Sequence, residues 1–238
     1  MNETNLSKRL ATVAKYVPKN SRLADIGSDH AYLPAWLIQH DLIEAAVAGD
    51  VVKGPFQSAD KLVRHLGLTN QIAVRLADGL EAIEEKDQID VITIAGMGGA
   101  LIRDILQRGK ENQRLSGQER LILQPNIGEK ILRQWLVENN YYILFEEILE
   151  EDHKIYEVIV AEKQLDPVIY TPKEIMFGPC LIKENSLVFQ KKWQHELGQK
   201  KQILKQLQAA NQPLEEKVQG FKQEVTWIKE VLNIDEGE

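Results

Sequence analysis

The 238-residue sequence predicts an α/β protein with a doubly wound, mostly parallel sheet and an added helical part. Two patterns support this prediction. Up to about residue 163, short apolar runs alternate with amphipathic helical segments, which is the order that a parallel sheet covered on both faces requires. After a linker with several prolines, long polar-rich helical patterns replace this alternation. We therefore expect two domains, residues 1–164 and residues 165–238.

Local patterns place the elements of the first domain in order. A helix over 7–17 ends before a proline, and a buried strand over 21–27 ends on a glycine. The last stretch, 141–163, is expected to form two antiparallel strands joined at Asp152 and His153. Between them we expect helices over 31–41, 55–66 and 128–139, and strands over 45–51, 71–79, 89–96 and 120–126.

The second domain is predicted to be a helical coiled coil behind a linker over 165–179. In its last helix, apolar residues recur at alternating steps of four and three, which is a heptad seam: Leu214, Val218, Phe221, Val225, Ile228 and Leu232. The preceding helix carries a matching stripe of Phe189, Trp193, Leu197, Leu204 and Leu207. The patterns meet at Asn211-Gln212-Pro213, and a proline suits the first turn of a helix. An antiparallel hairpin is the simplest arrangement, but the seam could also pair two chains, so both a monomer and a weak dimer are open.

Composition narrows the class of protein. No charge-free apolar run approaches the roughly 20 residues of a membrane span, and no secretory signal is visible, so we expect a cytoplasmic protein. The single cysteine, Cys180, excludes an internal disulfide and a cysteine-based zinc cluster, and the histidines lack metal-ligand spacing, so no metal is expected. A net charge of −7 argues against nucleic acid as a partner, but basic residues gather locally near the N-terminus and over 183–205.

The turn after the first strand, residues 25–31 (DIGSDHA), gives the first chemical signal. A strand that enters a glycine turn before a helix is the nucleotide-binding arrangement of open α/β sheets. Asp29 and Ala31 stand where the dinucleotide fingerprint has its second and third glycines. Since a carboxylate there would repel a pyrophosphate, the turn argues against a nicotinamide dehydrogenase. It favours a ligand with a positive centre, such as S-adenosylmethionine.

Later strand ends strengthen this interpretation. Asp50 ends the second strand, where an acidic side chain can accept hydrogen bonds from ribose hydroxyls. Asp78 ends the third strand and could accept one from an adenine amino group. The fourth strand ends in the glycine-rich segment 96–99, which lets the backbone approach a ligand closely. All these features lie at carboxyl ends of strands, the edge where such sheets bind ligands.

The segments ADIGSDHAYLP, AGDVVKGPFQSA, ADGLEAI, IAGMGG, LQPN and EDHKIYEVI, in this order and spacing, closely resemble the bacterial tRNA (adenine-22, N1)-methyltransferase family, TrmK. The resemblance covers residues 5–163 and extends into the helical part. It implies a class I, Rossmann-like fold that uses S-adenosylmethionine, with a C-terminal coiled coil. It also implies methylation of N1 of adenine 22 in tRNA.

Site residues follow from the motifs and the resemblance together. We expect the cofactor to contact Asp25, Gly27, Asp29, His30, Asp50, Val51, Asp78, Gly79, Gly96, Met97 and Gly98. Asp29 is the candidate catalytic residue, because a carboxylate near the purine would stabilise the positive charge that moves onto it. Alternatives stay open: Asp29 could cap the following helix, Asp25 could cap backbone amides of the turn, and the glycines could form only a tight turn.

Basic residues are the candidate tRNA contacts, since structured RNA is recognised largely through its shape and backbone. The candidates are Lys8, Arg9, Arg22, Lys191, Lys192, Lys200 and Lys201. The alternative for the helical lysines is the solvated face of a coiled coil. The alternative for the whole chain is a non-catalytic RNA-binding or scaffold protein that retains a cofactor pocket.

Overall fold

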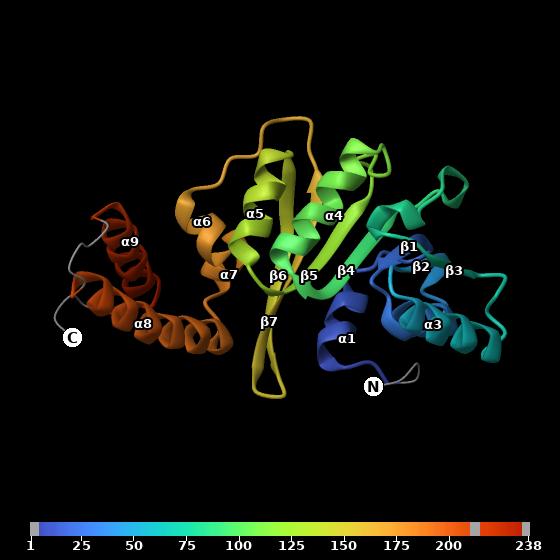
Figure 1. Ribbon diagram of the computed structural model, residues 1–238, viewed down its shortest axis with the longest axis horizontal. Helices are drawn as coiled ribbons and strands as arrows, with labels where there is room; N and C mark the ends of the chain where they lie inside the picture. Colours follow the sequence, from blue (N-terminus) through green and yellow to red (C-terminus); the bar gives the residue numbers. More distant parts are fainter. Residues whose placement is uncertain (1–4, 210–214, 235–238) are drawn as a thin grey trace.

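The structure, a computed structural model, describes residues 5–209 and 215–234. Its centre is a twisted sheet in the order β3-β2-β1-β4-β5-β7-β6 (Figure 1). The first five strands are parallel, and β7 runs antiparallel to both β5 and β6. The strands are β1 (Ser21–Ile26), β2 (Ile43–Asp50), β3 (Ile72–Leu76), β4 (Val91–Gly98), β5 (Arg120–Ile127), β6 (Tyr141–Glu151) and β7 (Lys154–Lys163). The predicted doubly wound sheet with an antiparallel pair at its edge is confirmed.

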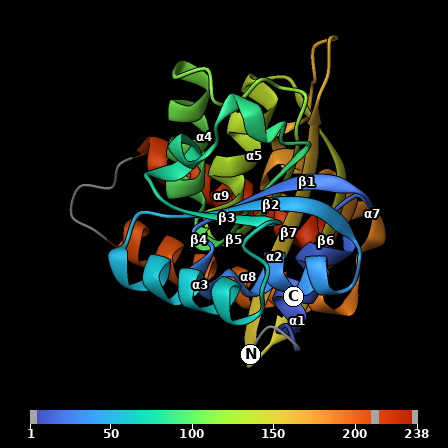
Figure 2. The same cartoon turned by 90° about the vertical axis from the view of Figure 1, so that its right-hand side faces the viewer.

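Helices cover both faces of this sheet (Figure 2). On one face lie α1 (Lys8–Lys15), α2 (Tyr32–Gln39) and α3 (Lys53–His65), which bury their apolar sides against residues such as Leu23 and Ile122. On the other face lie α4 (Gly99–Glu111) and α5 (Glu129–Glu138), packed against Ile26 and Ile94. Alternate residues of one strand serve the two layers, and this explains why the strands are apolar on both sides.

Helix α4 is an element that the sequence interpretation did not name. It begins directly after the glycine-rich end of β4 and buries Ile102, Ile105 and Leu106. Gly109 lies on the same side, where an added Cβ would sit 2.2 Å from Leu80 Cδ1. The missing side chain therefore lets α4 lie close against the short helical turn Gly79–Ala82.

The segment predicted as a linker is partly helical, which corrects that prediction. It contains α6 (Pro172–Phe177), and α7 (Pro179–Glu184) follows at once. A capping box starts α6, with the Thr171 side chain accepting from Glu174 N and the Glu174 side chain accepting from Thr171 N. Phe177 is fully buried. The segment is thus a packed connection rather than a free tether.

The C-terminal helices α8 (Leu187–Gln208) and α9 (Glu215–Val231) pack on each other, and we call this pair the arm. Trp193 and Ile228 of the arm share an apolar cluster with Phe177 and with Ile148 of the sheet. Along the predicted seam, Val218 and Ile228 are buried. Leu214 and Asn211-Gln212-Pro213 lie outside the described residues. The two-domain division stays a proposal.

Candidate active site: a pocket at the carboxyl edge of the sheet

A cavity of about 390 Å³ opens at the carboxyl ends of β1, β2 and β4. The order of strands reverses between β1 and β4, and open α/β sheets bind ligands at such switch points. Most of the residues predicted to contact a cofactor line this cavity: Asp25, Gly27, Asp29, Asp50, Val51, Asp78, Gly79, Gly96 and Met97. His30 and Gly98 are not among the lining residues.

Gly27 makes the floor of the pocket possible. Its φ of 73° is in the left-handed region, and an added Cβ would lie 2.0 Å from Met97 Cε. Its amide donates to the Gly49 carbonyl at 2.8 Å, which ties the turn after β1 to the neighbouring strand. A larger residue at this position would therefore strain the backbone and displace the end of the Met97 side chain.

Asp25 is buried beneath the pocket with a side chain that two hydroxyls satisfy. Ser28 Oγ and Thr93 Oγ1 each donate to it at 2.6 Å. Burial raises the pKa of Asp25, and the two hydroxyl hydrogen bonds partly offset that rise. The side chain binds hydroxyls rather than the backbone amides that the alternative interpretation expected, and it holds the turn in shape from below.

The turn Asp29-His30-Ala31 has an unusual backbone. All three residues have positive φ angles, of 22°, 59° and 55°. Outside glycine such angles are uncommon, and three in a row indicate strain of the kind that functional sites retain. Ala31 occupies the N-cap position of α2, so Asp29 does not cap that helix. The Asp29 side chain is instead 65% exposed at the cavity, with Oδ1 at 3.4 Å from His30 Nε2.

The two remaining carboxylates of the cavity lining come from the ends of β2 and β3. Asp50 Oδ1 accepts from Val52 N at 2.7 Å, which fixes the carboxyl group at the end of β2. Asp78 is more exposed and pairs with Arg108 Nη2 of α4 at 2.9 Å. Val51 and Val52, both exposed, add an apolar wall next to Asp50.

A polar network around Gly96 was missed by the sequence interpretation. Gln124, fully buried on β5, accepts from Gly96 N at 2.9 Å and from Arg9 Nη1 at 2.5 Å. Asn126 Nδ2 donates to Gly96 O at 2.7 Å. Both polar groups of the Gly96 peptide are thus held by side chains of the neighbouring strand. Arg9, one of the predicted tRNA contacts, lines the cavity.

The other predicted tRNA contacts are dispersed. Arg22 is at the amino end of β1, on the opposite edge of the sheet from the pocket, and donates to Asp87 O. Lys200 pairs with Glu224 at 2.7 Å and is only 18% exposed. Lys8 and Lys191 converge on Glu150 near the end of β6: Lys8 Nζ donates to its carbonyl, and Lys191 pairs with its carboxylate. Lys201 is half-buried on α8.

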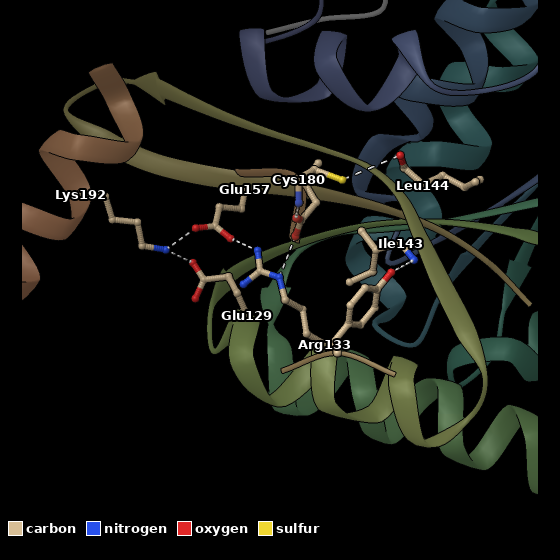
Figure 3. Close-up of polar contacts among 9 residues, drawn as sticks. Glu129, Arg133, Ile143, Leu144, Glu157, Cys180 and Lys192 are labelled. Atoms are coloured by element: carbon tan, nitrogen blue, oxygen red, sulfur yellow. Dashed lines mark hydrogen bonds and ion pairs between the residues drawn. The ribbon is translucent and has the colours of Figure 1, made fainter. Parts of the chain in front are cut away.

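Lys192 belongs to a buried group of charges at the base of the arm, which we call the arm-base cluster (Figure 3). Its Nζ is 2.6 Å from Glu129 Oε1 and 2.7 Å from Glu157 Oε1. Glu157 also pairs with Arg133 at 2.5 Å, and Arg133 pairs with Glu146 at 2.7 Å. This engagement argues against a phosphate contact by Lys192, because such a contact would leave Glu157 with one cation fewer.

Within residues 5–209 and 215–234, no group of three or more His, Cys, Asp or Glu side chains could hold a metal ion. Nor does this part of the chain form a helix of the length and apolarity that a membrane crossing requires.

Comparisons with known proteins agree with the geometry. The family model of TrmK, tRNA (adenine(22)-N(1))-methyltransferase, matches residues 23–230. The tRNA (adenine(22)-N(1))-methyltransferase of Bacillus subtilis is 46% identical over 239 residues, covering 98% of this chain and 99% of the relative. The crystal structure of the B. subtilis enzyme TrmK superposes with a TM-score of 0.90 at 45% identity, covering 96% of this chain and 99% of that one.

A second relative carries a ligand. A Streptococcus pneumoniae protein described as a putative tRNA (m1A22) methyltransferase, solved in complex with S-adenosyl-L-methionine, has a TM-score of 0.86 at 46% identity. The alignment covers 96% of this chain and all of that chain. The family model covers most of the chain, and the B. subtilis relative covers almost all of it. On sequence and structure alike, this chain belongs to the TrmK family of tRNA (adenine(22)-N(1))-methyltransferases.

Proposed function

We propose that this chain methylates N1 of adenine 22 in tRNA with S-adenosylmethionine as methyl donor, and that the pocket between β1, β2 and β4 is the site of transfer. Family membership supports the reaction. The observation that supports the site is its charge: four aspartates and one arginine line a cavity at the switch point of the sheet.

The residues of the pocket fit this cofactor. S-adenosylmethionine supplies an electrophilic methyl group on a positively charged sulfur, next to an ammonium group. Asp25 and Asp29 place negative charge at the end of β1, where these cationic groups would be stabilised. Asp50 would accept from the ribose hydroxyls, and Val51 and Ile105 offer apolar surface for an adenine ring.

Methylation of adenine N1 requires little acid–base chemistry from the protein. The N1 atom is unprotonated at neutral pH and carries a free lone pair, so no general base is needed. The protein must align N1 with the methyl group and exclude water. Asp29, exposed at the mouth of the pocket, would stabilise the positive charge that develops on the purine and accept from its amino group. The rigid Gly96 peptide would form the opposite wall.

The target adenine must leave its stack to reach this pocket, at a cost of a few kcal/mol. We propose that Lys8, Lys191 and Lys201 contact tRNA phosphates, since these three are not enclosed by carboxylates as Lys192 is. They run from α1 past the end of β6 and along the arm. We propose further that residues 1–164 and 165–238 are the two functional domains, that the arm pairs within one chain, and that the protein works in the cytoplasm with its tRNA.

A transcript pair tests the proposed reaction. Unmodified tRNA with adenine at position 22 and a matched transcript with guanine there would be incubated with the enzyme and S-adenosylmethionine labelled in its methyl group. We expect label only in the adenine transcript, recovered as 1-methyladenosine. Label in neither transcript, with cofactor binding shown by titration, would contradict the proposal and favour a non-catalytic RNA-binding protein.

A further inference from the structure

Arg9 reaches the pocket from outside the loops that form it. It belongs to α1, the helix that packs on the sheet before the first strand begins. Its guanidinium lies over Gly96, where an added Cβ would be 3.2 Å from Nη1. Two neighbours hold it there: Gln124 Oε1 accepts from Nη1, and the Tyr156 ring lies 5.5 Å from the guanidinium carbon. The side chain is therefore fixed in place.

In the described part of the chain no carboxylate pairs with the guanidinium of Arg9, although Glu151 accepts from its backbone amide at 3.3 Å. Arg9 is nevertheless half-buried. Its hydrogen-bond acceptor, Gln124, is a neutral amide. Arg108 and Arg133, in contrast, each pair with a carboxylate. A half-buried cation without a counter-ion at the wall of a cavity is well suited to receive an anion from a ligand.

The chemistry of the cofactor supplies that anion. The methionine end of S-adenosylmethionine carries an ammonium and a carboxylate side by side. The aspartates that line the cavity suit the ammonium and sulfonium, but they would repel the carboxylate. Among the described residues that line the cavity, Arg9 is the one lysine or arginine, and it lies at Gly96, across the switch point from Asp25 and Asp29.

We propose that the Arg9 guanidinium binds the carboxylate of S-adenosylmethionine and so recognises the amino-acid end of the cofactor. This rests on the proposed cofactor site. Arg9 also donates to Gln124, and the same Gln124 oxygen accepts from Gly96 N. Binding of the cofactor carboxylate by Arg9 would therefore be linked to the Gly96 peptide, the proposed wall beside the target base. Arg9 then acts in cofactor binding rather than as a contact to tRNA phosphates.

A pair of ligands that differ only in the carboxylate tests this proposal. Calorimetric titration would compare S-adenosylmethionine with decarboxylated S-adenosylmethionine, which keeps the sulfonium and the ammonium. The proteins would be the wild type, Arg9→Gln and the control Lys19→Gln, which removes one positive charge at an exposed position outside the cavity lining. Thermal melting of each variant would report whether it folds.

The wild type and Lys19→Gln are expected to bind S-adenosylmethionine about 10- to 100-fold more tightly than its decarboxylated form, the range of a charge-assisted hydrogen bond. In Arg9→Gln this preference should fall to within about threefold, because affinity for S-adenosylmethionine drops while affinity for the decarboxylated ligand stays. Arg9→Lys should restore part of this preference, since a lysine ammonium keeps the positive charge but lacks the paired N–H donors of the guanidinium.

Other outcomes would overturn the proposal in distinguishable ways. Equal weakening of both ligands in Arg9→Gln would mean that Arg9 only shapes the pocket. Unchanged affinity for both, with weaker tRNA binding, would return Arg9 to the tRNA contacts. A folded wild-type protein that binds neither ligand would overturn the cofactor site, and the role of Arg9 with it.

Discussion

The pocket and the arm-base cluster both gather charged side chains but treat them in opposite ways. At the arm base, Arg133, Glu146 and Glu157 are almost fully buried, and each is paired. At the pocket, Asp29 and Arg9 face a cavity, and neither has an ion-pair partner of fixed charge in the described chain. Buried charges that are paired with one another maintain the fold, whereas unpaired charges that face a cavity are available to a ligand.

The arm-base cluster also shows how far pairing can outweigh burial. Burial alone would raise the pKa of Glu157, but Arg133 and Lys192 more than offset it and hold the pKa below its usual value. Glu146 has Arg133 as its cation, and burial keeps the pKa of Glu146 above its usual value. The cluster joins α5, the last two strands and α8, so these charges set how the arm leaves the sheet.

Removal of Arg133 is the strongest test of the cluster. Arg133→Met would leave Glu146 and Glu157 buried without their shared cation, and we expect a loss of about 3–5 kcal/mol in the free energy of unfolding. Urea denaturation would measure it. The control Arg114→Met breaks an exposed pair with Glu81 and should cost about 0–1 kcal/mol. Equal losses in the two variants would contradict the structural role of the cluster.

Removal of the open charge of Asp29 should affect catalysis more than binding. Asp29→Asn keeps the shape and tolerates the positive φ, so only the charge is lost. Turnover on tRNA is expected to fall about 100-fold, while affinity for S-adenosylmethionine falls by a smaller factor, because Asp25 still places negative charge near the cationic groups of the cofactor. Single-turnover kinetics and a binding titration would separate the two. Unchanged turnover would refute the catalytic role.

Asp50 should show the reverse behaviour. Asp50→Ala is expected to weaken cofactor binding by about 1–3 kcal/mol, because the ribose hydroxyls would lose their acceptor. Asp60→Ala, on the neighbouring helix α3, removes a surface carboxylate that pairs with Arg64 and serves as the control. A titration in which both variants bind the cofactor like the wild type would remove Asp50 from the site.

Two adjacent lysines of α8 allow the same comparison within a single turn of helix, because Lys192 belongs to the arm-base cluster and Lys191 is exposed. Lys192→Met should destabilise the fold by about 1–3 kcal/mol, since buried Glu157 loses one of its two cations. Lys191 is 60% exposed, so Lys191→Met should change stability by less than about 1 kcal/mol. It should instead reduce the salt slope of tRNA binding by about one unit. If both lysines affected tRNA binding alone, the separation of roles would be wrong.

The sheet and the acidic part of the pocket were predictable because their signals are local. Each strand is an apolar run, and the carboxyl ends of parallel strands meet at one edge, so Asp25, Asp50 and Asp78 could be brought together from their positions alone. The roles of Arg9, Gln124 and Lys192 were not predictable in this way. Each depends on a partner far away in the sequence, and a lysine on a helix gives no sign of whether carboxylates from other elements enclose it.

Asp25 combines features of the two regions, because it is buried like the arm-base cluster but faces the pocket without a cation. Burial raises the pKa of Asp25, so the folded state holds the proton more tightly than the unfolded chain does. Stability contributed by this group therefore decreases as pH rises from about 4, the ordinary pKa of aspartate, through the higher pKa of the folded state.

Asp25→Asn removes that titration and can keep both hydrogen bonds, since the hydroxyls of Ser28 and Thr93 can donate or accept. We expect the stability of the variant relative to wild type to increase between pH 4 and pH 7, while its affinity for S-adenosylmethionine falls. Urea denaturation at both pH values measures the first effect, and titration measures the second. The opposite result, a relative stability that declines as pH rises, would show that the charged Asp25 carboxylate stabilises the fold, as the paired charges at the arm base do. The charge of Asp25 would then have a structural role and would not be available to bind a ligand.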